Sequence, residues 1–260
     1  MNPGSTATAT LYETYVNTQI GTLHRADTDE FESYARHYRK CLLPHLPASR
    51  GARILDLGCG MGHLLYFLEQ EGFRNYLGID IGAQQIACCR NAVTGRVELV
   101  DDSAEYLRAN TGAFDAIVCI DVLEHLDDEP LFDLARAAHT ALRPGGRMIV
   151  GVPNAACVTT LMTRYSDLTH RRLLTEISLR QLFLNSGFDQ IELHPLEKRV
   201  VRSFRHRGAF WAWRIRERLV RWLLLELYQQ LMEGAVPEIL TVNILGVATR
   251  TADEPAQSHL

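Results

Sequence analysis

The sequence has few of the features that mark secreted or membrane-spanning proteins. Its six cysteines include no pair at CxxC spacing, so we expect buried free thiols rather than a disulfide scaffold. The amino-terminal MNPGSTATAT has neither a basic nor an apolar segment, which predicts a cytoplasmic protein. The most apolar stretch, 219–228, is broken by Arg221 and Glu226, whereas a bilayer requires roughly 20 apolar residues in a row.

The chain also has no excess of positive charge. The chain has 27 lysines and arginines against 31 acidic residues, a net charge of −4, which disfavours a dedicated nucleic-acid binder. Hydrophobic residues make up 47% and charged residues 22%, values typical of soluble globular chains. Its 260 residues therefore predict one domain with a full core and an appendage.

Short apolar runs alternate with helical stretches over most of the chain. The runs tend to be apolar at successive positions, which is typical of strands covered by helices on both faces. Short connections between strands and helices indicate right-handed βαβ units and a doubly wound α/β sheet. The expected strands are 53–57, 75–80, 96–100, 114–120, 146–152 and 188–193, and the expected helices are 62–70, 82–91, 103–109, 127–141 and 178–186.

The same pattern divides the chain into five regions. Residues 1–50 are expected to form a tail and a helical cap, and 51–194 the ligand-binding core. A basic, aromatic helical insertion at 195–236 precedes the last core strand at 237–250, and a disordered tail is expected at 251–260.

The strongest motif is a glycine loop, LDLGCGMGHL, which begins in the first expected strand. Gly58, Gly60 and Gly62 allow a sharp turn and let a ligand approach main-chain N–H groups. Asp56 precedes them and would repel a phosphate, but it could accept a hydrogen bond from an ammonium group. The loop therefore favours a cationic or zwitterionic ligand over a dinucleotide.

Further acids follow the next two strands. Asp80, 22 residues after Gly58, is placed to accept the two hydroxyls of a ribose. Asp102 in the turn after the third strand could accept a hydrogen bond from the amino group of an adenine. A ligand with an amino-acid end, a ribose and an adenine is S-adenosylmethionine.

With these motifs the chain resembles the class I S-adenosylmethionine-dependent methyltransferases over about residues 50–249. LDLGCGMG, GID, VDDSAEYL, FDAIVCIDVLEHL and ALRPGGRMIVGVPN follow in order. The resemblance implies a Rossmann-like, mostly parallel seven-stranded sheet with a final antiparallel hairpin, in which 239–249 is the inserted strand. It also implies that the methionine end contacts Asp56, Gly58, Cys59, Gly60 and Gly62, the ribose Asp80 and Ile81, the adenine Asp102 and Ser103, and the sulfonium side Asp121.

A group of acids and histidines follows the fourth strand. Asp121, Glu124 and His125 have the spacing of one helical face, and His170 in a later loop would complete a site for Mg²⁺ or Mn²⁺. A similar arrangement occurs in metal-dependent 2′-O-methyltransferases of small RNA and in some quinone-pathway O-methyltransferases. Without a metal, Glu124, His125 or His170 could act as the catalytic base, or these side chains could only shape the pocket. A histidine base predicts a titration near its ordinary pKa of about 6.5.

The loop RYSDLTH is expected to contact the acceptor through Arg164, Tyr165 and Asp167. It resembles a subgroup of bacterial enzymes of surface-polysaccharide and glycosylated natural-product pathways, which implies a small-molecule or glycan acceptor methylated on oxygen. Three alternatives stay open: an N-methyltransferase of an aminosugar or other small metabolite, a metal-dependent RNA 2′-O-methyltransferase, and a regulatory protein that binds the cofactor without catalysis.

Residues 198–221 form a basic and aromatic segment. It has nine lysines and arginines and one acid, and all three tryptophans of the chain lie in or beside it. This composition is typical of contact with an anionic membrane surface or a lipid-linked substrate, and less so of nucleic acid. An amphipathic element that packs on the sheet or pairs two subunits of a homodimer is the simpler alternative.

Overall fold

A computed structural model of the chain describes residues 27–93, 96–197, 207–231 and 237–251. The amino-terminal tail, most of the carboxyl-terminal tail and residues 198–206 of the basic segment lie outside these residues. Each of the six cysteines lies inside them and has a free thiol, and four of the six are buried, in line with the sequence-based expectation.

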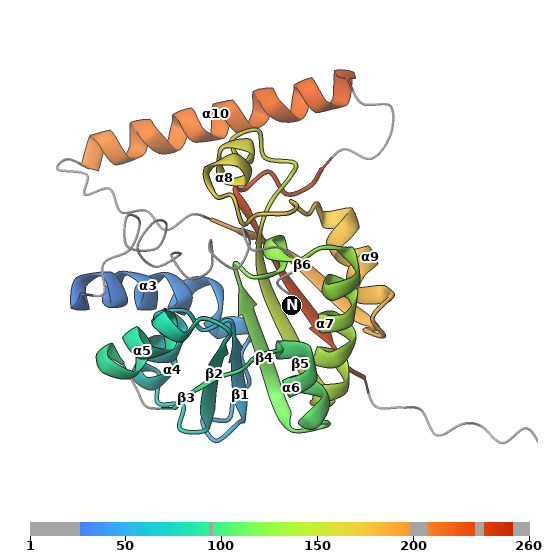
Figure 1. The fold of residues 1–260 in the computed structure, drawn as a ribbon. Coiled ribbons are helices and arrows are strands. Elements are labelled where there is room, and N and C mark those ends of the chain that lie inside the picture. Colours follow the sequence, from blue (N-terminus) through green and yellow to red (C-terminus); the bar gives the residue numbers. More distant parts are fainter. Residues whose placement is uncertain (1–26, 94–95, 198–206, 232–236, 252–260) are drawn as a thin grey trace, which may run out of the picture.

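The centre of the fold is a seven-stranded sheet in the order β3-β2-β1-β4-β5-β7-β6 (Figure 1). Strands β1 to β5 run parallel, and β7 is antiparallel to both of its neighbours, β5 and β6. The expected sheet is confirmed, and the inserted antiparallel strand is β7, which begins at Asn243 rather than at the expected 239. The strands are β1 Ile54–Leu57, β2 Tyr76–Asp80, β3 Val97–Leu99, β4 Phe114–Ile120, β5 Leu142–Pro153, β6 Gln190–Leu196 and β7 Asn243–Thr249.

Helices cover both faces of this sheet. Alternate residues of β4 point into different cores: Ala116 and Val118 pack with α3, α4 and α5, whereas Ile117 and Cys119 pack with α6, α7 and α9. Burial on both faces explains why the strand is apolar at successive positions. The helices are α3 Thr28–Cys41, η2 Leu43–His45, α4 His63–Gln70, α5 Ala83–Ala92, α6 Ser103–Ala109, η3 Leu123–His125, α7 Asp128–Ala141, α8 Thr160–Ser166, α9 Glu176–Leu184 and α10 Arg207–Leu231.

Side chains next to the helix ends explain where some of them begin. Asp27 accepts a hydrogen bond from the Glu30 amide at 2.9 Å and caps α3. Thr175 and Ser178 exchange hydrogen bonds in a capping box at the start of α9. Helix α9 thus begins at Glu176, two residues before the expected start at 178.

Strand β5 differs most from the sequence-based expectation, because it begins at Leu142 rather than at 146. The Arg250 guanidinium donates to the carbonyl oxygens of Thr140 and Leu142, and main-chain hydrogen bonds join Arg250 to Gly145 and Gly146. Contacts with the distant Arg250 thus hold the proline- and glycine-containing start of β5, in which Gly145 has a φ of 80° and the register with β4 shifts. Strand β6 is also displaced, to 190–196 from the expected 188–193.

Candidate active site

The glycine loop lies between β1 and α4, at the carboxyl end of β1. The chain order reverses between β1 and its neighbour β4, which is where open α/β sheets bind ligands. Gly58 has a φ of 78°, and a Cβ there would lie 2.4 Å from Cγ2 of Val122. Gly62, with a φ of 93°, would place a Cβ 2.5 Å from the Cys89 sulfur. Glycine is required at both positions on two counts, backbone conformation and space.

Asp56 is buried in β1, directly before the glycine loop. Its side chain is 3% exposed, and Oδ2 makes no hydrogen bond within the described part of the chain. Burial raises the pKa of this carboxyl well above its usual value, and the nearby Cys89 and Asp80 add to the rise. A buried carboxylate oxygen without a donor can accept a hydrogen bond from a cationic ligand.

Asp80 joins the loop to the end of β2. Its carboxylate accepts hydrogen bonds from the Gly60 amide at 2.9 Å and from the Gly82 amide at 2.7 Å. Burial still raises the pKa of Asp80, against the effect of the Gly82, Gly60 and Ile81 amides. Each carboxylate oxygen has a second lone pair, so Asp80 retains capacity to accept a pair of hydroxyls.

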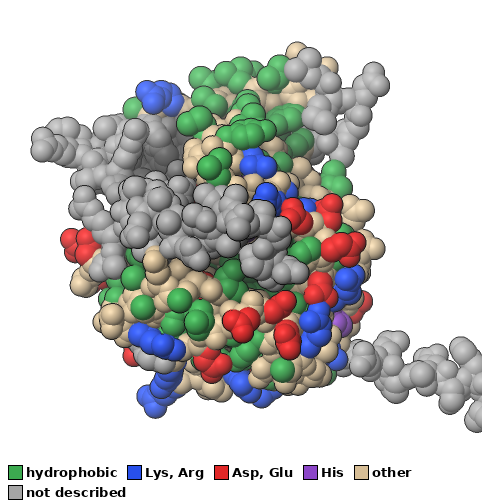
Figure 2. All heavy atoms as spheres, viewed as in Figure 1, with side chains coloured by type: hydrophobic (Ala, Val, Ile, Leu, Met, Phe, Trp, Pro, Cys, Tyr) green, Lys and Arg blue, Asp and Glu red, His purple; other side chains and the backbone are tan. Residues whose placement is uncertain are grey.

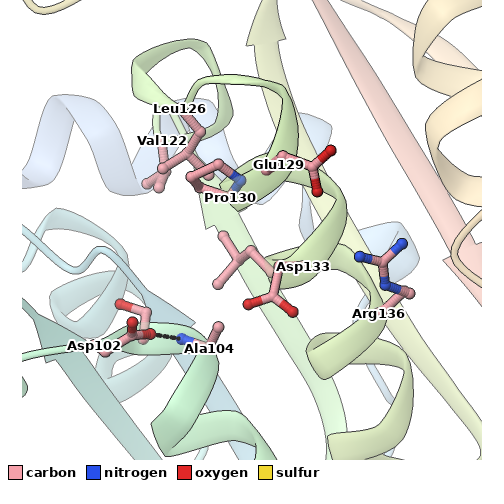
Figure 3. A pocket seen from close by; sticks show the side chains of 10 residues that line it. Asp102, Ala104, Val122, Leu126, Glu129, Pro130, Asp133 and Arg136 are labelled. Carbon is pink, nitrogen blue, oxygen red and sulfur yellow. Dashed lines mark hydrogen bonds between the residues drawn. The ribbon is translucent and has the colours of Figure 1, made fainter. Parts of the chain in front are cut away.

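Asp102 has a structural function at the start of α6. Its Oδ1 accepts hydrogen bonds from the amides of Ala104 at 2.7 Å and Glu105 at 3.1 Å, and so caps the helix. Asp102 and Ser103 also line a cavity of about 330 Å³ between α6 and the segment from η3 to α7 (Figure 3). The apolar part of its wall includes Val122, which also contacts the glycine loop, and Leu126.

Asp121, at the end of β4, is an exposed residue in an unusual conformation. Its φ is 54°, and it is the one residue other than glycine with a positive φ in the described part of the chain. Its amide donates a hydrogen bond to the Gly151 carbonyl at 3.0 Å. Aspartate tolerates this left-handed region better than most residues, and such conformations cluster at functional sites.

The structure brings together three of the four expected metal ligands. One ligand atom from each of Glu124, His125 and His170 lies within 4.8 Å of the other two. The side chain of Glu124 is 1% exposed, and its Oε2 makes no hydrogen bond in the residues that the structure describes. Burial raises the pKa of Glu124 well above its usual value, and Asp121 and Asp167 raise it further. Asp121 itself is not in the group.

Hydrogen bonds fix the ring protons of both histidines. Thr169 donates its hydroxyl proton to Oδ1 of Asp167 at 2.6 Å, because a carboxylate only accepts. The hydroxyl oxygen then accepts from Nδ1 of His125 at 2.8 Å. His170 donates from Nδ1 to the Thr163 carbonyl at 3.0 Å. Each neutral imidazole therefore has its lone pair on Nε2, the arrangement of a metal-ligating histidine.

The two rings lie close together, with centroids 4.7 Å apart. Burial, reinforced by His170, lowers the pKa of His125 to about 4, although Asp167 acts in the opposite direction. Burial also lowers the pKa of His170. The pKa of His125 is therefore lower than the value near 6.5 that the sequence predicts for a histidine base. Its imidazole is neutral at pH 7 and suits coordination of a cation.

The loop after β5 is held against η3 by its main chain. The amides of Arg171 and Arg172 donate to the Glu124 carbonyl at 2.7 and 3.2 Å, and the Arg172 side chain donates to the Leu126 carbonyl at 2.8 Å. These bonds fix His170 next to Glu124. Sequence reasoning missed Thr169 and Thr163, since a threonine in a loop has no pattern that reveals such a function.

The three expected acceptor contacts lie in different surroundings. Residues 160–166 form α8 rather than a loop, which places Arg164 and Tyr165 on a helix. Tyr165 is 75% exposed, and the Arg164 guanidinium, which bonds the Arg171 carbonyl, lies 5.3 Å from its ring centroid. Asp167 is buried and bonds Thr169 through both the hydroxyl and the amide. Asp167 thus supports the histidines in this structure.

A second group of metal-ligating side chains lies away from the glycine loop. His45, from η2, and Glu192 and His194, from β6, also place ligand atoms within 4.8 Å of one another. This group is only partly buried, with Glu192 exposed, and Nε2 of His194 lies 3.3 Å from the Glu192 carboxylate.

Solved structures resemble the whole of this architecture. A SAM-dependent methyltransferase from Archaeoglobus fulgidus has a TM-score of 0.62 at 20% identity, covering 93% of this chain and 99% of that one. Phosphoethanolamine N-methyltransferase 2 of Haemonchus contortus, in complex with S-adenosyl-L-methionine, has a TM-score of 0.57 at 16% identity, covering 93% and 60%. At such identities the likeness concerns the fold.

The family is shown by sequence. A model of the methyltransferase-domain family matches residues 27–193, more than half of the chain. The chain belongs to this methyltransferase family. The expected fold, enzyme class and cofactor, those of a Rossmann-like S-adenosylmethionine-dependent methyltransferase, are confirmed at the level of the family.

Two curated relatives share one name. The ubiquinone biosynthesis O-methyltransferase of Cronobacter sakazakii is 33% identical over 116 residues, 43% of this chain and 46% of that protein. The protein of the same name from Xanthomonas oryzae pv. oryzae is 29% identical over 163 residues, 53% and 66%. The chain thus spans about half the length of the first of these relatives. Both names refer to quinone biosynthesis and not to a glycan, so the expected carbohydrate specificity is not supported.

Proposed function

We propose that the protein transfers the methyl group of S-adenosylmethionine to a phenolic hydroxyl of a small aromatic acceptor, and that Glu124, His125 and His170 hold a divalent cation. The observation that carries this proposal is that Glu124, His125 and His170 place one ligand atom each within 4.8 Å of one another. In addition, the buried Oε2 of Glu124 makes no hydrogen bond in the described residues. The quinone-pathway names of the curated relatives support the choice of an aromatic acceptor.

The donor set favours particular cations. One carboxylate and two imidazoles suit Mn²⁺ better than Mg²⁺, which prefers oxygen ligands throughout. A bound cation would supply a Lewis acid that lowers the pKa of an acceptor hydroxyl. Glu124, His125 and His170 would supply three ligands. The hydrogen bonds from Asp167 through Thr169 would keep the proton of His125 on Nδ1 and its lone pair on Nε2.

Other residues of the chain would align the methyl donor. Asp56 Oδ2, which makes no hydrogen bond in the described residues, would accept from the ammonium group of the cofactor, and Asp80 would accept from the ribose. Val122 and Leu126 would cover the adenine in the cavity next to Asp102. The acceptor oxygen must then lie about 3 Å from the methyl carbon and in line with the bond that breaks.

The test uses the full chain and methyl-labelled S-adenosylmethionine with three matched acceptors: a catechol, a hexose and an aminosugar. We expect label on the catechol, loss of transfer in EDTA and its return with Mn²⁺. Label on the hexose would restore the glycan acceptor that the RYSDLTH loop predicts, and label on the aminosugar nitrogen would support N-methylation. Full transfer in EDTA would contradict the metal site.

A pair of variants assigns the bound metal to this site. Glu124→Gln removes the carboxylate ligand at nearly constant shape. We expect this variant to lose tight Mn²⁺ binding, which electron paramagnetic resonance measures. His194→Ala, in the group that includes His45 and Glu192, is the matched control and should leave tight binding intact. Loss of tight binding in His194→Ala but not in Glu124→Gln would show that the metal binds at His45, Glu192 and His194 instead.

A further inference from the structure

Helix α10 presents a face on which large apolar side chains are about half exposed or more. It has 25 residues and comes after β6 and before β7 along the chain. It passes over α8 at one end of the molecule (Figure 1). Tyr228 donates a hydrogen bond from its hydroxyl to the Ala156 carbonyl at 2.7 Å, and Leu224 and Leu225 are partly buried. One side of α10 thus packs against the rest of the chain.

The other side carries large apolar residues that are about half exposed or more. Trp211, Ile215 and Leu219 repeat at a spacing of four, so they lie along one face of the helix. The same surface continues over α8 and its flanks, where hydrophobic side chains gather in Figure 2. The full set is Trp211, Ile215, Leu219, Val220, Trp222, Leu223 and Leu227 on α10, and Val158, Leu161, Met162, Tyr165 and Leu168 around α8.

A patch of this kind on a monomer marks a binding surface. Its charge indicates what it binds. The α10 sequence has five arginines and two glutamates, Arg216 and Arg218 are exposed, and the stretch 198–221 has nine basic residues and one acid in a chain of net charge −4. Two copies of α10 placed face to face would bring these like charges together. An anionic surface instead complements them.

The length and composition of α10 also limit how it could meet a membrane. Among the described residues, no helix is long and apolar enough to cross a bilayer. A helix with tryptophans and leucines on one face and arginines nearby instead lies in the plane of the lipid headgroups. We propose that the apolar face of α10, continued by α8, docks the enzyme on an anionic phospholipid membrane. This docking is independent of the acceptor that is methylated.

All three tryptophans of the chain lie in α10, so intrinsic tryptophan fluorescence reports on this helix alone. The probe is a unilamellar vesicle of phosphatidylcholine with about one third phosphatidylglycerol, and vesicles of pure phosphatidylcholine test the contribution of charge. We expect a blue shift of the emission and co-sedimentation of the full chain with anionic vesicles, both weaker at high salt. An unchanged spectrum together with protein that stays in the supernatant would overturn the proposal.

Variants separate the apolar from the basic contribution. Leu219→Glu with Leu223→Glu places two charges on the exposed face, and we expect it to abolish binding to vesicles. Ile177→Glu with Leu184→Glu is the matched control, since both residues are similarly exposed on α9. Arg216→Gln with Arg218→Gln should weaken binding about 30-fold, because each arginine near an anionic surface contributes roughly five-fold.

Sedimentation without vesicles tests the other occupants of this face. The proposal would be overturned if the protein did not bind vesicles and instead formed a dimer that Leu219→Glu with Leu223→Glu dissociates. That result would show that a second copy covers the face. Equal loss of vesicle binding in the α9 control would do the same. Because none of these measurements uses catalysis, their failure is distinguishable from failure of the proposed reaction.

Discussion

The hydroxyl of Thr169 lies 2.8 Å from Nδ1 of His125, a residue 44 positions earlier in the chain. Asp167 accepts the hydroxyl proton, and this contact decides that the lone pair of His125 is on Nε2. A hydroxyl with no place in any recognised motif thus controls the state of a candidate metal ligand.

Replacement of Thr169 tests this relationship. Thr169→Ala removes the group that orients His125, and we expect Mn²⁺ affinity to fall about 10- to 100-fold, as is usual when such a partner of a ligand is lost. Thr169→Ser keeps the hydroxyl and should restore most of the affinity. Calorimetry with Mn²⁺ measures both, and equal affinities in the wild type and the Ala variant would refute the relationship.

Removal of either histidine should separate turnover from cofactor binding. We expect His125→Ala and His170→Ala to lower turnover on the true acceptor about 10²- to 10⁴-fold. Affinity for S-adenosylmethionine should stay within a few-fold of the wild type, because neither side chain belongs to the glycine loop or the cavity near Asp102. Wild-type turnover in both variants would contradict a catalytic function of the histidines. A carboxylate such as Glu124 would then be the better candidate for the base, or the acceptor would be an amine.

The glycine loop predicts a clear loss of cofactor binding. Gly58→Val must place a side chain where Cγ2 of Val122 lies and must keep a φ of 78°. We expect S-adenosylmethionine binding to be abolished in calorimetry. Gly51→Ala is the control, since its nearest neighbour, the Ser49 hydroxyl, would lie at an ordinary contact distance of 3.7 Å. Normal binding by the Gly58 variant would disprove the assignment of the loop.

Cofactor affinity should also depend on pH through Asp56. Burial raises the pKa of the free protein's Asp56, whereas a bound ammonium group would lower it. Between these two pKa values the free protein holds a proton that the complex lacks, so binding releases a proton and affinity rises with pH. The window extends upward from near the ordinary aspartate pKa of about 3.9.

Calorimetry in buffers of different ionisation enthalpy measures this proton release. Asp56→Asn cannot titrate, so its affinity should be lower and nearly independent of pH over the same window. Any remaining dependence belongs to Asp80, whose pKa burial also raises. An Asn variant with the full wild-type pH dependence would exclude Asp56 as the titrating group.

The sequence by itself determined the fold class, and it predicts where the cofactor binds. Strands that are apolar at successive positions, separated by short connections, leave few arrangements other than a doubly wound sheet. Gly58, Asp56 and Asp80 could be assigned because their spacing from the strand ends is local. Parallel strands that end at one edge of a sheet bring such residues together whatever the rest of the chain does.

Only the tertiary structure decided the chemistry of the histidines and the surface of α10. The bond between Thr169 and His125, the buried oxygen of Glu124 and the early start of β5 beside Arg250 all depend on segments far apart in sequence. Composition predicted a basic aromatic segment, but exposure depends on which helix face the rest of the protein leaves uncovered. Burial and hydrogen-bond partners arise from packing, and packing is not a property of any local window of sequence.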